Sequence, residues 1–192
     1  MIARDLEQLL TMHSGYQPGE IDQRLRPLRD HNLIPYGPRG PNAPQMQPLH
    51  AALIVLTMVS RRAAAAGEIA RRAMDLQLVP RKGVALDGSH RFAAFLATGL
   101  KVGSSWMQRI EVSCDGSLAW ATVVDKRKRV TLLFCDDKKM MEWVAENPET
   151  YDAQGGSLCN HRFVMSAAVI DAIMLNLTEE QPAVYAKKKV LA

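Results

Sequence analysis

Residues 14–41 read SGYQPGEIDQRLRPLRDHNLIPYGPRGP, and this stretch decides the expected fold. Ser14 and Gly15 end one helical pattern, since glycine readily takes the left-handed conformation at a helix end. Pro18 and Glu20 open a second helix, because proline fits the first turn and an acid is stabilised near the helix N-terminus. A segment rich in proline and glycine follows, which excludes a helix and permits a tight loop. The expected order is helix, corner, helix, loop.

Further helices are expected on both sides of this stretch. A first helix is predicted by apolar residues that recur at helical intervals, together with one histidine: Ile2, Leu6, Leu9, Leu10 and His13. Downstream, a third helix opens at Pro48 and runs toward Ala66, and a fourth covers residues 68–78 before Pro80. Residues 1–80 are therefore expected to form a winged helix-turn-helix domain, in which the loop serves as the wing.

Pro27 leaves the course of the second helix open. A proline inside a helix removes one backbone donor and clashes with the preceding turn, at a cost of about 3 kcal/mol. Either the helix kinks at Pro27, or it ends near Arg26 and a short turn begins there.

The second half of the chain changes character toward strands. Residues 106–114, 118–124 and 130–135 are rich in β-branched and aromatic side chains, and Asp115-Gly116 is a strong hairpin signal. This pattern predicts a three-stranded antiparallel sheet. Helices are expected at residues 89–99, 140–146 and 165–177. The expected fold class is α+β, with residues 81–192 forming a small α+β domain for dimerisation or partner binding.

Charge is distributed unevenly along the chain, whose formal net charge is +4. Residues 1–85 carry eleven Lys and Arg against seven Asp and Glu, whereas residues 86–192 carry thirteen of each kind. All of the net positive charge therefore lies in the first half, where it is compatible with a polyanionic partner.

The second helix is expected to enter the major groove of a duplex, with Ile21, Leu25 and Leu28 anchoring its inner side. Gln and Arg on the outer side are the residue types that contact adenine and guanine edges through two hydrogen bonds. Arginines near the wing suit phosphates, which fix register rather than sequence. The expected DNA-binding residues are Gln17, Gln23, Arg24, Arg26, Arg29, Arg39 and Asn42.

Residues 24–35, RLRPLRDHNLIP, precede a Gly/Arg loop and a helix, and this order resembles the MerR-type winged helix-turn-helix pattern. The stretch is also similar to the N-terminal module of small regulators encoded by phages and prophages, over roughly residues 1–65. The resemblance implies recognition-helix roles for Arg24 and Arg26. The chain departs from the pattern at Asn32, where a glycine is usual, and it lacks a long dimerising coiled coil. The effector-sensing role of that family is not carried over.

The expected partners are double-stranded DNA and a second copy of the chain. Residues 165–177 form a helix that is apolar on most sides, and such a helix is buried or covers a partner, so we expect a homodimer through the C-terminal domain. The transcription machinery is a further candidate partner. No membrane partner is expected, because no window approaches the roughly 18 apolar residues of a span. The acidic start is unlike a signal peptide, and the expected location is cytoplasmic.

No enzyme, metal site or cofactor is expected. Ser89 and His90 are adjacent, so their side chains diverge, and no Walker-type phosphate loop is present. Cys159 and His161 do not have the spacing of a closed zinc site. Residues 126–129, KRKR, either hold phosphates or form a solvated turn.

The sequence thus predicts a sequence-specific, DNA-binding transcriptional regulator of phage or prophage type. The alternative is an adaptor or structural protein that uses the same helix-turn-helix module to dock another protein. Salt dependence separates the two, because binding to phosphates weakens steeply as salt is added.

Overall fold

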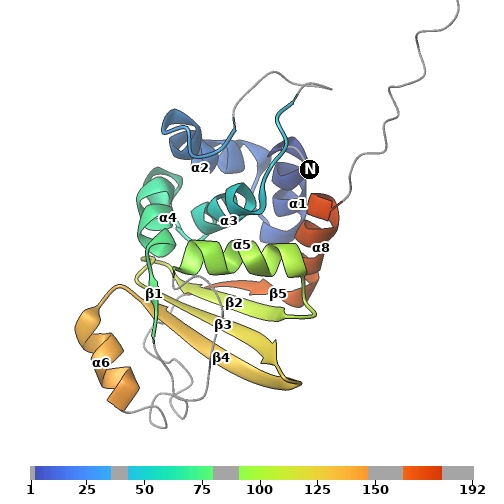
Figure 1. Cartoon of the computed structure of the whole chain (residues 1–192). Helices are drawn as coiled ribbons and strands as arrows, with labels where there is room; N and C mark the ends of the chain where they lie inside the picture. The colour runs from blue at the N-terminus through green and yellow to red at the C-terminus, as the bar shows by residue number, and fades with distance from the viewer. Residues whose placement is uncertain (1–2, 36–42, 80–90, 147–161, 179–192) are drawn as a thin grey trace, which may run out of the picture.

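A computed structural model describes residues 3–35, 43–79, 91–146 and 162–178 (Figure 1). The helices are α1 (Ala3–Ser14), α2 (Pro18–Asp30), α3 (Pro48–Thr57), α4 (Ala66–Met74), α5 (Phe92–Val102), α6 (Lys138–Glu146) and α8 (Ala167–Thr178), with a short 3-10 helix η1 (Ala63–Ala65) before α4. The strands are β1 (Gln77–Leu78), β2 (Met107–Ser113), β3 (Leu118–Asp125), β4 (Lys128–Cys135) and β5 (Arg162–Ser166). The chain is of mixed α+β class, as expected.

The sheet has five antiparallel strands in the order β1-β4-β3-β2-β5 rather than the three that the sequence predicts. The meander β2-β3-β4 is the predicted part. β1 was missed because two residues are too short to form an alternating pattern. β5 was missed because the apolar spacing of the final helix begins within it, so that Met165 was assigned to the helix.

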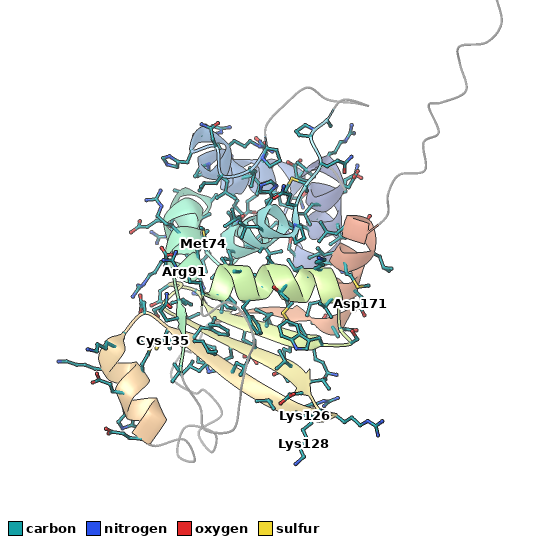
Figure 2. All side chains as sticks on the ribbon, in the orientation of Figure 1. Met74, Arg91, Lys126, Lys128, Cys135 and Asp171 are labelled. Atoms are coloured by element: carbon teal, nitrogen blue, oxygen red, sulfur yellow. The ribbon has the colours of Figure 1, made fainter. Side chains whose placement is uncertain are left out.

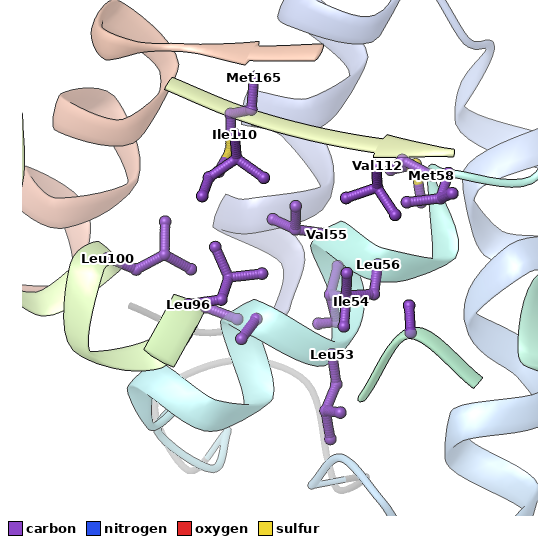
Figure 3. Packing of buried hydrophobic residues seen from close by; sticks show 14 of the residues in the cluster. Leu53, Ile54, Val55, Leu56, Met58, Leu96, Leu100, Ile110, Val112 and Met165 are labelled. Carbon is purple, nitrogen blue, oxygen red and sulfur yellow. The ribbon is translucent and has the colours of Figure 1, made fainter. Parts of the chain in front are cut away.

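Helices cover one face of the sheet in two tiers. α5 crosses this inner face, and α3 packs on the far side of α5, with α1, α2, α4 and α8 around it (Figure 1). Figure 3 shows Leu96 and Leu100 of α5 between Ile110 of β2 and the apolar side chains of α3. On the outer face, Met141 of α6 packs against a smaller cluster made of Val79, Leu118, Trp120, Leu133 and Cys135.

One buried cluster extends across the predicted boundary between residues 80 and 81. It contains Leu6 of α1, Ile54 of α3 and Ile173 of α8 as well as the inner face of the sheet. The turn between β2 and β3 also touches α4, because a Cβ at Gly116 would lie 2.7 Å from the backbone oxygen of Ile69. The described parts of the two predicted domains therefore share a single core.

α2 continues through Pro27 and ends at Asp30, which settles the alternative that the sequence left open. Asn32, two residues beyond this end, has a φ of 53° and so takes the left-handed conformation in place of the usual glycine. α4 approaches α2 closely, because a Cβ at Gly67 would lie 2.6 Å from Cβ of Pro27. α3 stops at Thr57 instead of running toward residue 66.

Among the described residues, no helix has the length and apolar character needed to cross a membrane.

Candidate nucleic-acid interface

α2 lies on the side of the helical layer that is farthest from the sheet (Figure 1). Its inner side is anchored as predicted, because Ile21, Leu25 and Leu28 are all buried. The helix is therefore held by the core and is not covered by the chain's own sheet. The helix can bind a partner only through those of its polar residues that reach solvent.

Arg24 does not reach solvent, and the expectation that it faces a duplex is wrong. Its side chain is fully buried, and its guanidinium points at the C-terminal end of α3. Nη1 donates to the carbonyl oxygens of Thr57 at 3.3 Å and Ser60 at 2.5 Å, and Nη2 donates to that of Arg61 at 3.3 Å. These bonds satisfy carbonyls at and beyond the end of a helix, where a positive charge is also favoured by the helix dipole.

The remaining contacts of Arg24 neutralise its charge inside the molecule. Nη2 also donates to Oε1 of Glu20 at 2.7 Å, and the guanidinium carbon lies 4.1 Å above the centre of the Tyr16 ring. Only Nε lacks a hydrogen-bond acceptor among the described residues. Arg24 is thus a structural brace between α2 and α3.

Arg29 is likewise committed to partners within the chain. Its guanidinium pairs with Glu7 of α1 at 2.5 Å and also with Asp22 of α2. The side chain is only 21% exposed. A phosphate would have to compete with both carboxylates, so the expected phosphate-binding role of Arg29 has little support from its surroundings.

Three of the predicted DNA-binding residues lie on the surface. Gln17 precedes α2, and Gln23 and Arg26 stand about one turn apart on the outer side of the helix. The Arg26 side chain is 67% exposed and lies 3.9 Å from Asp22, a loose surface pair. The other two predicted residues, Arg39 and Asn42, lie outside the described residues.

The β3–β4 hairpin carries a second basic group at its end. Lys126, Arg127, Lys128 and Arg129, here called the basic tip, are all exposed. None of them forms an ion pair with any residue that the structure describes. Figure 2 shows Lys126 and Lys128 projecting at the end of the hairpin, and α2 lies at the opposite end of the molecule.

The spacing of α2 contains a signal for the burial of Arg24 that the prediction overlooked. Residues 21, 24, 25 and 28 follow the spacing of a single helical face, so the same rule that buries Ile21, Leu25 and Leu28 also buries Arg24. Glu20 stands one turn earlier as a ready partner.

Comparisons of the chain with protein-family models, with curated proteins and with solved structures found no match. The resemblance to MerR-type modules therefore stays a prediction. In the parts of the chain that the structure describes, no three His, Cys, Asp or Glu side chains converge as metal ligands do. Cys159 and His161 lie outside those parts. Burial raises the pKa of the Cys135 thiol to about 11, so this thiol is protonated at neutral pH.

Proposed function

We propose that this protein binds double-stranded DNA as a transcriptional regulator of phage or prophage type, with α2 approaching the major groove. One observation carries the proposal: Gln23 and Arg26 are exposed on a helix whose opposite side is fixed in the core. A reading helix needs this combination, because base contacts demand side chains that are held within fractions of an ångström. Glutamine suits adenine and arginine suits guanine. The buried brace of Arg24 supports the proposal by fixing the helix rather than by touching DNA.

The homodimer through the C-terminal region remains part of this proposal. The apolar side of α8 was expected to need a second chain. Ile170 and Ile173 are instead buried by α1, α5 and β2 of the same chain. In the described part of the C-terminal region, Val164 of β5, the outermost strand of the described sheet, is 47% exposed and is the surface that we assign to a partner.

The alternative function, docking of another protein by the same helix, is favoured by a specific observation. With Arg24 buried and Arg29 paired, Arg26 is the exposed cation of α2, and it stands on the same helix as the half-exposed Asp22 and the exposed Asp30. This surface carries no excess of positive charge. A helix face without such an excess gains little from phosphates but is well suited to a protein surface.

Selection of bound fragments from a random pool of duplex DNA, followed by mobility-shift titration across salt, tests the proposal. We expect enrichment of one site, affinity that falls steeply with salt, and relaxed base preference in Arg26→Ala by about 1–3 kcal/mol. Lys101→Ala is the control, since Lys101 is exposed at the end of α5 and lies outside this surface. Absence of any enriched site, with a protein partner whose binding Arg26→Ala weakens, would favour docking instead.

A further inference from the structure

We propose that the basic tip of the β3–β4 hairpin binds the phosphate backbone of duplex DNA, as a contact separate from α2. The inference rests on the proposed function for its ligand, but it uses none of the same residues. Three features of the tip carry it: its charge, its backbone conformation and its shape.

The charge of the tip is not neutralised within the described structure. Its four cations stand beside a single acid, Asp125, and all four side chains are exposed. In α2, by contrast, all three arginines pair with carboxylates of the chain, although the pair of Arg26 with Asp22, at 3.9 Å, is a loose one. Each cation that neutralises a phosphate releases a condensed counterion, so a cluster of unpaired cations gains binding free energy that paired ones do not.

The backbone conformation of the tip is unfavourable in free energy for the lysine and the arginine that adopt it. Asp125 pairs with Lys128, so the hairpin turns within two residues, Lys126 and Arg127. Their φ values are 45° and 68°, a left-handed conformation that turns of this kind normally give to Asn-Gly. Glycine and asparagine adopt it cheaply, whereas a lysine and an arginine are strained there. A strained conformation that presents two long cations at the apex is best explained by what those cations bind.

The shape of the hairpin end suits a groove of duplex DNA. The segment before β2 stays hydrogen-bonded to β3 as far as Val124, whose N–H donates to the carbonyl of Trp106, and the segment after β1 reaches β4 as far as Leu133, whose carbonyl accepts from the N–H of Val79. The end of the hairpin is therefore a two-stranded ribbon, with strands about 5 Å apart. A major groove about 12 Å wide admits such a ribbon. The turn offers no apolar side chain for insertion into a bilayer, which favours DNA over an anionic membrane.

The decisive variant replaces the turn by its preferred residues, Lys126→Asn with Arg127→Gly. It removes two cations while keeping a sequence that favours the same turn, so loss of binding cannot be ascribed to unfolding. Lys138→Gln with Lys139→Gln on α6 removes the same charge from another exposed place and is the matched control. A third variant, Gln23→Ala with Arg26→Ala, tests α2. The probe is a 30-base-pair duplex of random sequence, titrated at several salt concentrations.

We expect the tip variant to lose about tenfold or more in affinity and to reduce the slope of log affinity against log salt by about 2, one for each phosphate contact. The α6 control should match the unaltered protein in both quantities. The α2 variant should keep the part of the salt slope that the tip contributes. It should lose only the preference for a selected site over random sequence.

Other outcomes would overturn the inference in distinguishable ways. If the unaltered protein binds duplex DNA and the tip variant keeps its affinity and slope, the tip is not a contact, and the proposed function stands. Equal losses in the tip and α6 variants would mean that net charge alone matters. If the unaltered protein binds no duplex, both proposals fail. If the unaltered protein and the α6 control bind phosphatidylserine vesicles and the tip variant does not, the ligand of the tip is a membrane surface.

Discussion

α2 and the basic tip are both rich in cations, yet the molecule uses those cations differently. In α2, Arg24 closes the end of α3 and Arg29 joins α1 to α2, so their charges serve the fold. In the tip, four cations face solvent without a partner among the described residues. A count of basic residues therefore overestimates the positive charge that α2 presents to solvent and underestimates that of the hairpin.

The difference has a geometric cause. A helix places residues three and four positions apart on one face, so the acids of α2 fall beside its arginines. A helix packed in a bundle also brings its arginines near carboxylates and carbonyl ends of its neighbours. The apex of a hairpin has neighbours on neither side. Cations placed there stay available unless a partner supplies the anion.

The largest expected effect is on the brace. Arg24→Met should destabilise the protein by about 3 kcal/mol, because it leaves buried carbonyls of Thr57 and Ser60 without donors and removes the partner of Glu20. Urea unfolding followed by circular dichroism measures the change. Arg26→Met, the same substitution two residues along at an exposed site, should stay within about 0.5 kcal/mol. Equal midpoints for the two variants would contradict the assignment of Arg24 as a brace.

A second, smaller effect tests whether α2 is also fixed by contact with α4. Gly67→Ala should cost about 2 kcal/mol, since its Cβ would lie 2.6 Å from the rigid ring of Pro27. Gly19→Ala in the first turn of α2 meets nothing within 4 Å and should be neutral or slightly stabilising. Thermal unfolding of both variants provides the measurement. A Gly67→Ala protein as stable as Gly19→Ala would show that the two helices separate easily.

The smallest effect is expected at the tip and has the opposite sign. Lys126→Asn with Arg127→Gly should stabilise the fold by about 1 kcal/mol, because the replacement residues adopt positive φ at lower cost. Lys138→Gln with Lys139→Gln should leave stability within about 0.5 kcal/mol. The urea midpoints of the two variants, compared where the unfolding free energy has the same slope against urea concentration, measure the difference. A loss of stability in the tip variant would indicate that these cations, like Arg24, serve the fold.

Much of the fold was predictable from local pattern. The meander β2-β3-β4 follows from alternation and from Asp115-Gly116, and the inner stripe of α2 follows from the spacing of its apolar residues. Asn32, which stands where the resembled pattern has a glycine, has a φ of 53°. These features depend on neighbours within a few residues, which a sequence displays directly.

What the sequence did not predict depends on contacts between distant segments. β1 is a strand only because its two residues pair with β4, and β5 only because it pairs with β2. Arg24 is a brace because the carbonyl oxygens of Thr57, Ser60 and Arg61, at and beyond the end of α3, lie beside it. At the candidate site, local spacing predicts the exposure of Gln23 and Arg26 and also contains the signal for the burial of Arg24, but the carbonyl oxygens that accept from Arg24 lie more than thirty residues away and could not be predicted.

The meeting of α1 with α8 has a consequence for synthesis of the protein. Buried leucines of α1 lie in the same core as Ile170 and Ile173, and α8 is the last described helix to leave the ribosome. β2 likewise lacks its edge neighbour until β5 has emerged. The nascent chain therefore carries exposed apolar surface from the synthesis of α1 until α8 has emerged. Such a chain depends on rapid late closure, or on a chaperone, to avoid aggregation.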